Sequence, residues 1–284
     1  MIVALVLISA FFHALWNALL RVEPDKDRGL VGAIAFASVF ALIIAGVRWG
    51  IDGMPLFATT EAFGWTILAG VFEAIYFTTL VRALERGKLG PVYTISRGGA
   101  VLVVWPLSIL LFHEVVTRTS GIGSLLVLGG LVLCGVGAHG VDRGGRGRSG
   151  VWWAVACAVS IAGYHLAYKA ALQTGGSPSA TFAISLALSA AISIVRIGGD
   201  GRRTLVAVVR GRTFRIALMG IVCGGSFLIL MEALARGGSG YVLTLRNTSV
   251  LFAAGLAFAI GERPAHAEIT GAALVAGGAV LMAW

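Results

Sequence analysis

Charged residues are scarce in this sequence. Only 12% of its 284 residues are charged, whereas 58% are hydrophobic. Soluble domains carry about 25% charged residues, and one soluble core of this size cannot bury so much apolar surface. The composition therefore excludes an ordinary soluble domain and predicts an all-α polytopic membrane protein, whose main partner is the lipid bilayer.

Cysteine is also rare. Cys134, Cys157 and Cys223 all lie inside apolar runs, and their spacing fits neither a metal site nor a redox motif. We expect them to be small core residues. The sequence therefore predicts no disulfide framework, no metal site and no cofactor.

Signatures of enzymes are missing as well. The sequence has no HExxH zinc motif, no Walker phosphate-binding loop, and no GxSxG segment followed by a suitable Asp and His. We therefore expect no enzymatic activity and no ATP-driven pumping. Secondary transport is the class of membrane function that remains.

The positive charge has a membrane explanation. The net charge is +9, but the basic residues form short clusters between apolar segments rather than one continuous face. This pattern is typical of loops that fix membrane topology beside anionic lipid. We expect no nucleic-acid partner.

The apolar segments are long enough to cross a bilayer. A hydrocarbon core of about 30 Å needs roughly 20 helical residues. Ten runs meet this length, at approximately 1–20, 29–48, 62–84, 90–112, 120–139, 150–172, 178–197, 213–235, 240–260 and 267–284. The sequence therefore predicts ten transmembrane helices.

A repeated segment divides these helices into two sets. Residues 83–90 and 233–240 share the pattern Ala-Leu-x-Arg-Gly-x-x-Gly, each between two apolar runs. The register continues through the pairs Val92 and Val242, Thr94 and Thr244, Arg97 and Asn247, and Gly121 and Gly271. Five spans per copy is an odd number, so the second copy is expected to be inverted. The predicted organisation is a first five-helix repeat over 1–142, a basic linker over 143–149 and a second repeat over 150–284.

The distribution of basic residues supports the inversion. They gather in the odd-numbered connections between the predicted spans. The first and third connections contain Arg21, Lys26, Arg28, Arg82, Arg86 and Lys88. The seventh and ninth connections contain Arg196, Arg202, Arg203, Arg210, Arg212, Arg215 and Arg263. By the positive-inside rule, the odd-numbered connections face the cytoplasm and both termini lie outside.

Glycine marks two helices as packing elements. Gly129, Gly130 and Gly135 lie in the fifth span, and 271–278 in the tenth span contains three more glycines. Small residues let helices approach closely in lipid. We expect these two helices to pack closely, with a role in gating as the alternative.

Two segments carry a family resemblance. Residues 113–115, His-Glu-Val, and residues 261–263, Gly-Glu-Arg, occupy similar places in the two copies. With ten spans, a five-helix repeat and a glycine-rich helix after each motif, the chain resembles the EamA branch of the drug/metabolite transporter superfamily. Within that branch it looks most like bacterial exporters of amino acids, including aromatic ones.

The resemblance implies a fold, a location and a transport path. It implies an integral protein of the bacterial cytoplasmic (inner) membrane. Substrate would pass between the two repeats along the first, third, fourth, sixth, eighth and ninth spans, with the fifth and tenth at the periphery. The family often has both termini in the cytoplasm. The basic residues of this chain favour the opposite orientation, which we retain as the expectation.

Two spans carry a similar polar and aromatic pattern. The first span contains Phe12, His13, Trp16 and Asn17, and the sixth contains Tyr164, His165, Tyr168 and Lys169. A spacing of four residues places each aromatic pair on one helical face. These faces are candidates for a substrate site with aromatic walls. The alternative is that they fill helix contacts. Either histidine is a candidate proton carrier, which makes protons a further candidate partner.

Three ionisable residues lie within predicted spans. Glu73 is in the third, Arg97 in the fourth and Arg246 in the ninth. Such residues must face protein or water. In a functional interpretation, an arginine attracts a carboxylate or phosphate and Glu73 attracts an amine or carries a proton. In a structural interpretation, Glu73 pairs with Arg97. Further candidate lining residues are Tyr76, Tyr93, Phe227 and Asn247.

These observations predict a secondary transporter that exports small amphipathic metabolites as a monomer. Amino acids, specifically aromatic ones, are the expected substrates, and the expected mechanism is alternating access between inverted repeats. One alternative is a carrier of organic anions or phosphorylated metabolites. Another is an intramembrane binding or signalling protein that moves nothing.

Overall fold

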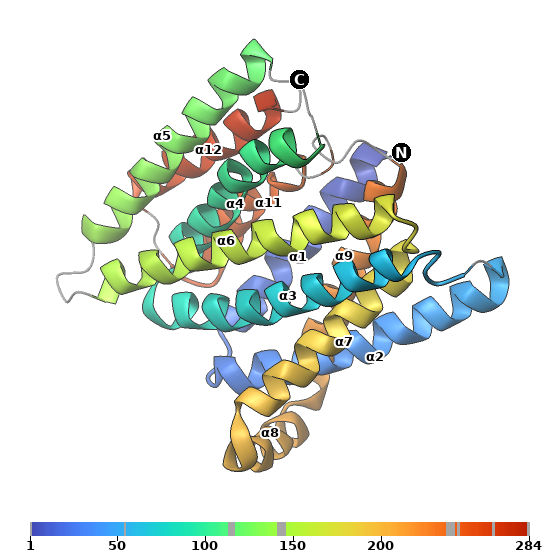
Figure 1. The fold of residues 1–284 in the computed structure, drawn as a ribbon. Coiled ribbons are helices and arrows are strands. Elements are labelled where there is room, and N and C mark those ends of the chain that lie inside the picture. Colours follow the sequence, from blue (N-terminus) through green and yellow to red (C-terminus); the bar gives the residue numbers. More distant parts are fainter. Residues whose placement is uncertain are drawn as a thin grey trace.

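The computed structural model describes residues 2–53, 55–112, 117–140, 146–236, 242, 245–262 and 265–282, and it is helical throughout apart from short connections (Figure 1). In chain order the helices are α1 (Ile2–Arg21), α2 (Lys26–Asp52), α3 (Thr60–Arg86), α4 (Leu89–Phe112), α5 (Arg118–Gly140), α6 (Arg146–Gln173), α7 (Pro178–Arg196), α8 (Gly198–Gly211), α9 (Thr213–Arg236), α11 (Ser249–Ala259) and α12 (His266–Met282).

Several of these helices are suited to a membrane. Among the described residues, α1 to α4, α6, α7 and α9 are long and apolar enough to cross a bilayer. Shorter apolar helices cover Gly121–Cys134, Ser249–Ala259 and His266–Leu281. An all-α membrane protein is therefore confirmed. That all ten predicted segments cross the bilayer stays a prediction. Their arrangement as two inverted repeats also stays a prediction.

The ends of the helices follow local sequence signals. Asp25 caps α2, since its side chain accepts from the backbone N–H of Arg28. Ser177 caps α7, and Pro178 occupies the first helical position, where its missing N–H costs nothing. Gly53 ends α2 at a φ of 62°, in the left-handed region that glycine adopts readily.

Helix α8 is absent from the predicted spans and corrects the sequence analysis. Residues 198–212 read as a polar connection, but 198–211 form a helix. Leu205, Val208 and Val209 recur at the spacing of one helical face, and Arg202, Arg203 and Arg210 lie outside that set. Because this amphipathic pattern covers only 14 residues, a search for long apolar runs misses it.

The predicted span at 240–260 is not continuous. Residues 245–246 are helical, 247–248 form a turn, and α11 begins at Ser249. The Thr248 hydroxyl donates to the Leu245 carbonyl oxygen at 2.8 Å. Short polar side chains compete for backbone groups in this way and disfavour a regular helix. Residues 237–241, 243 and 244 lie outside the described residues, as do 113–116, 141–145, 263, 264, 283 and 284.

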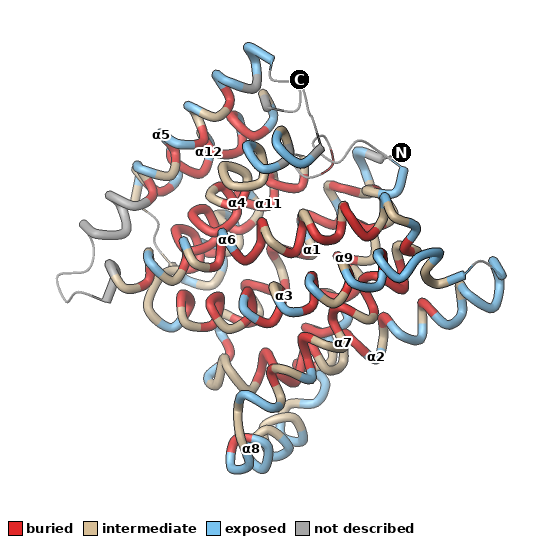
Figure 2. The backbone as a smooth tube through the Cα atoms, viewed as in Figure 1, coloured by how far each residue is buried: buried red, intermediate tan, exposed pale blue. Residues whose placement is uncertain are grey.

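Each half of the chain packs mainly against the other half. Helix α3 packs on α6 and α7, and α9 packs on α1 and α2. Helix α2 packs on α7, and α5 packs on α12. Buried residues fill the centre of this bundle and exposed residues cover the outside (Figure 2). Leu110, Leu125 and Phe258 are each at least 70% exposed, so the outer surface is apolar, as lipid contact requires.

The predicted close packing of two glycine-rich helices is confirmed for α5 and α12. A Cβ on Gly130 would lie 2.5 Å from the carbonyl oxygen of Gly271, and a Cβ on Gly278 would lie 2.5 Å from that of Gly123. The backbones therefore touch, which only glycine allows. Gly277, on the same helix, meets no atom within 4 Å.

The connections gather at two ends of the bundle. At one end, the loop before α3 and the loop before α7 pair through Ala58 N–H to Gly175 O and Ser177 N–H to Leu56 O, both 2.9 Å. At the other end, the ion pair of Asp27 and Arg196 joins the start of α2 to the end of α7. We call the latter the α8 end, because α8 follows Arg196 directly (Figure 1).

Candidate functional site

Most of the predicted site residues are buried in the interior of the bundle. We call this group the central cluster. It consists of His13, Trp16 and Asn17 of α1, Glu73 and Tyr76 of α3, Tyr93 and Arg97 of α4, Tyr164, His165 and Tyr168 of α6, Phe227 of α9, and Arg246 and Asn247 before α11. None is more than 6% exposed. Ionisable groups at this depth carry an insertion cost, so their presence needs an explanation.

His13 is bonded through one ring nitrogen. Its Nδ1 accepts from Trp16 Nε1 at 3.3 Å and from Arg246 Nη2 at 2.9 Å. These two donors assign the proton of a neutral imidazole to Nε2. Nε2 is buried and has no partner among the described residues. His13 therefore presents an unused N–H donor to the cluster.

Arg246 lies where the chain departs from regular helix. Its guanidinium carbon is 4.5 Å from the centre of the Phe227 ring, within cation–π range. Its Nε and Nη1 atoms are buried without a partner, and no carboxylate of the described part of the chain pairs with it. The cation is therefore held by the Phe227 ring, by His13 and by the Ser226 hydroxyl rather than by an opposite charge.

Arg97 approaches the same region from α4. Its guanidinium carbon is 5.8 Å from the centre of the Tyr93 ring, and that ring is 6.1 Å from the ring of His13. Its Nη2 atom is buried and unpartnered within the described ranges. Like Arg246, it has no carboxylate partner there. The cluster thus holds two buried guanidinium groups without an anion.

Glu73 supplies the carboxylate of the cluster, but it is bonded elsewhere. The Tyr168 hydroxyl donates to Glu73 Oε1, and the same hydroxyl lies 2.9 Å from Ser185 Oγ. Oε2 of Glu73 is buried, with no partner in the part of the chain that the structure describes. The structural alternative in which Glu73 pairs with Arg97 is therefore wrong for this conformation.

Aromatic rings connect the two charged sides. The Tyr164 ring is 5.7 Å from that of Tyr168, 6.1 Å from that of Phe227 and 5.5 Å from that of Tyr76. Phe182 of α7 stacks on Phe227 at 5.2 Å. Tyr164 thus lies between the Glu73 side and the Arg246 side, and the wall between them is aromatic.

The unpartnered polar atoms fall into two groups. His13 Nε2, Arg97 Nη2, and Nε and Nη1 of Arg246 are donors, whereas Glu73 Oε2 and Asn17 Oδ1 are acceptors. The hydroxyls of Tyr93 and Tyr164 and Nδ1 of His165 are also unpartnered among the described residues. Buried polar atoms are nearly always hydrogen-bonded, so each such orphan needs a water or ligand that completes it. The donors would bind an anionic group. The Glu73 acceptor would bind an ammonium group or a proton.

The remaining predicted residues contribute less. Phe12 is only half-buried, and its ring contact is with Phe11, so the structure does not bring it into the cluster. Asn17 Nδ2 donates to the His13 carbonyl oxygen of its own helix at 2.7 Å. His165 lies against Tyr164 at 4.5 Å, and its Nδ1 has no partner among the described residues. Proton transport by either histidine stays a prediction.

Sequence reasoning missed the contribution of α7. Phe182 stacks on Phe227, and Ser185 contacts Tyr168. A signal was present, because Thr181, Ser185, Ser189 and Ser193 repeat every four residues within an apolar span, and all four are buried. That spacing places a polar stripe on one face of α7, toward the interior.

A half-buried glutamate joins several elements at the α8 end. Glu262 Oε1 lies 2.7 Å from Arg21 Nε, and Glu262 Oε2 accepts from the Leu89 N–H at 2.9 Å. Arg21 Nη1 donates to the Leu84 carbonyl oxygen at 2.8 Å. These bonds, which we call the end bridge, tie the end of α1 to the α3–α4 turn and to the end of α11.

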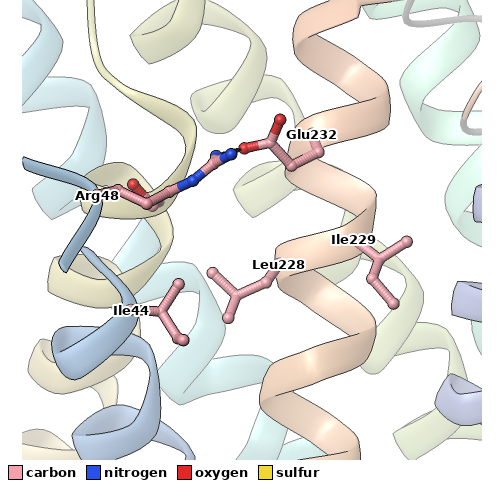
Figure 3. A pocket seen from close by; sticks show the side chains of 6 residues that line it. Ile44, Arg48, Leu228, Ile229 and Glu232 are labelled. Carbon is pink, nitrogen blue, oxygen red and sulfur yellow. Dashed lines mark hydrogen bonds and ion pairs between the residues drawn. The ribbon is translucent and has the colours of Figure 1, made fainter. Parts of the chain in front are cut away.

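A small pocket lies between α2, α7 and α9, away from the cluster. It has a volume of about 160 Å³ and is lined by Ile44, Arg48, Ser179, Leu228, Ile229 and Glu232. Arg48 and Glu232 point toward one another across it and form an ion pair (Figure 3). Ligand pockets begin at about 300 Å³. We therefore do not assign substrate to it. In the described ranges, no group of His, Cys, Asp or Glu could hold a metal ion.

Comparison with known proteins finds one transporter family and a similar solved structure. The model of the EamA-like transporter family matches residues 148–284. No curated protein matched the chain. One crystal structure is similar with a TM-score of 0.64 over 98% of this chain and 96% of its own, at 20% sequence identity. At that identity, the similarity establishes a shared fold.

Proposed function

We propose that the chain, whose residues 148–284 match the EamA-like transporter family, is a secondary transporter of small amphipathic amino acids, with aromatic ones preferred. It works as a monomer in the cytoplasmic membrane of a bacterium and exports its substrate. The observation that carries the substrate class is the central cluster, where unpartnered buried donors and an unpartnered carboxylate oxygen flank an aromatic wall.

Each part of an aromatic amino acid has a counterpart in the cluster. The carboxylate fits the free donors of Arg97, Arg246 and His13, because charge-assisted hydrogen bonds of this kind are the stronger ones. The ammonium fits Oε2 of Glu73. The side chain fits among the rings of Tyr164 and the residues around it. A bound zwitterion would thereby neutralise charges that otherwise lie uncompensated in the membrane interior.

The packing pattern supports an inverted repeat. Exchanging α1, α2, α3, α4 and α5 with α6, α7, α9, α11 and α12 converts the α1–α9 contact into the α6–α3 contact and the α2–α9 contact into the α7–α3 contact. The α2–α7 and α5–α12 contacts map onto themselves. Such exchange symmetry is what two inverted repeats around a central site require.

Alternating access needs an end that opens. In this conformation the cluster is closed from solvent, and the end bridge of Arg21 and Glu262 holds three elements together at the α8 end. We infer that breaking this bridge is one step of opening toward that membrane face. Binding of substrate would then shift the balance between the open and closed conformations.

One alternative function has an observation in its favour. The cluster holds two arginines and one carboxylate, and Glu73 bonds to Tyr168 rather than to a cation. A substrate with a negative charge and no amine, such as an organic anion, would use both arginines and leave Glu73 alone. The two functions differ in whether substrate needs an ammonium group.

Counterflow in liposomes tests the proposal. Purified protein is reconstituted with unlabelled phenylalanine inside, and labelled phenylalanine is added outside. Accumulation that is inhibited by tryptophan, and more weakly by phenylpyruvate, supports an amino-acid transporter. Stronger inhibition by phenylpyruvate than by phenylalanine favours the organic-anion carrier. Retained binding with no flux of any of these solutes would overturn both and leave an intramembrane binding protein.

A further inference from the structure

Helix α8 has two distinct faces. Leu205 and Val209 turn inward onto α2, where a Cβ on Gly32 would lie 2.9 Å from Val209 Cγ2. Arg203, Val206 and Arg210 are exposed and follow one another at spacings of three and four residues, which places them within about one-sixth of the helix circumference. Arg202 is also exposed and lies about 80° round the helix from Arg210. The inner face anchors the helix, and the outer face is exposed.

The outer face carries positive charge that the described residues leave largely uncompensated. Arg203 is 4.0 Å from Asp200, but both side chains are at least 89% exposed, so solvent screens this pair. Arg202 Nε donates to the Ile194 carbonyl oxygen at 3.1 Å, and neither Arg202 nor Arg210 pairs with a carboxylate of the described residues. By contrast, Arg212 and Arg215 beside α8 share the buried Glu23.

Exposed apolar side chains accompany these arginines. Val206 lies between Arg203 and Arg210 and is 49% exposed, and Phe214, in the first turn of α9, is 83% exposed. A phenylalanine so exposed is unfavourable in water. An arginine stripe beside apolar side chains is the composition of a helix that lies at a lipid headgroup layer.

The position of α8 agrees with a membrane surface. It begins at Gly198, two residues after α7 ends at Arg196, and Gly198 has a φ of 70° at this change of direction. It therefore lies where a membrane-spanning helix leaves the bilayer. The distribution of basic residues predicts that this end faces the cytoplasm, the side on which anionic lipids give the membrane a negative surface potential.

We propose that α8 is a binding site for the headgroups of anionic phospholipids, formed by Arg202, Arg203 and Arg210, with Val206 and Phe214 inserted beside the headgroups. Phosphate oxygens accept from the guanidinium groups, which suit phosphate geometry. The site lies on the outer surface of the bundle, separate from the central cluster. It does not depend on which solute the chain transports.

Titration with defined lipids tests this site. The full chain, purified in detergent, is titrated with fluorescent phosphatidylglycerol, and unlabelled phosphatidylglycerol or phosphatidylcholine competes. We expect competition by phosphatidylglycerol only. In the R202Q/R203Q/R210Q variant, affinity falls by about fivefold for each arginine removed, the equivalent of about 1 kcal/mol per basic residue near an anionic surface.

Control variants separate the site from general charge. R82Q/R118Q removes two arginines outside α8 and should leave the affinity unchanged. R210Q alone should lower it, which keeps the test decisive if the triple variant does not fold. Equal affinity in R210Q and the wild type would overturn the proposal. So would an equal loss in the control, or competition by inorganic phosphate as strong as by the lipid.

Discussion

Replacing Arg246 by glutamine tests how the cluster holds a carboxylate. Arg246 has two buried nitrogens without a partner, and no carboxylate in the described ranges pairs with it. A hydrogen bond to a charged group contributes about 1.5–3 kcal/mol. Because about 1.4 kcal/mol corresponds to a tenfold change in affinity, the variant should bind phenylalanine about 10- to 150-fold more weakly.

A second ligand isolates the carboxylate from other effects. Phenethylamine has the ring and the amine of phenylalanine but no carboxylate, so its affinity should be the same in Arg246→Gln and in the wild type. Binding is measured by displacement of labelled tryptophan from the purified protein. Arg236→Gln is the control, because Arg236 lies at the end of α9 with its side chain 50% exposed and pairs with Glu232.

Two results would contradict a carboxylate contact at Arg246. If Arg246→Gln weakens phenylalanine and phenethylamine equally, Arg246 does not bind the carboxylate and acts on the packing of Phe227 instead. If neither affinity changes, the free donors of Arg246 do not face substrate. Thermal unfolding of the variant checks that the protein is intact. Arg246→Lys should give an intermediate affinity, since it keeps the charge but not the planar geometry.

Three further predictions follow from particular contacts. Gly271→Ala would place a Cβ 2.5 Å from a carbonyl oxygen of α5 and should lower the free energy of unfolding by about 1–3 kcal/mol. Gly277→Ala, whose Cβ would meet no atom within 4 Å, should cause no such loss in the same thermal or denaturant assay. Glu73→Gln should weaken phenylalanine but not phenylpyruvate in the counterflow assay; equal losses would contradict an ammonium contact. Glu262→Gln should raise labelling of Ser226→Cys by a thiol reagent from the α8 end, and unchanged labelling would exclude the end bridge as a gate.

The sequence predicts the long membrane helices of this chain better than its short helix α8 and its turn at 247–248. Long apolar runs determine where membrane helices form, because the backbone must bond internally in lipid. Such runs do not report a 14-residue amphipathic helix like α8. Nor do they report the turn at 247–248, which depends on the bonding of Thr248 to a nearby carbonyl oxygen.

Site residues were predictable by type rather than by partner. Arg97, Arg246 and Glu73 stood out because charge is costly in a membrane span. Their partners depend on helix packing, and so the sequence could not decide whether Glu73 pairs with Arg97 or bonds to Tyr168. Phe12 fits the helical spacing of its neighbours, yet it lies at the edge of the cluster, since spacing does not fix which face of α1 meets α9.

Access to the central cluster from the two membrane faces tests the account most directly. Ser226 is fully buried beside His13, so Ser226→Cys, in a background without the three native cysteines, reports on the centre. In vesicles of known orientation, a membrane-impermeant thiol reagent is applied to one face at a time. The account predicts labelling from either face, slowed by phenylalanine. Labelling from one face only, or labelling that phenylalanine does not slow, would contradict a substrate site alternately open to both sides.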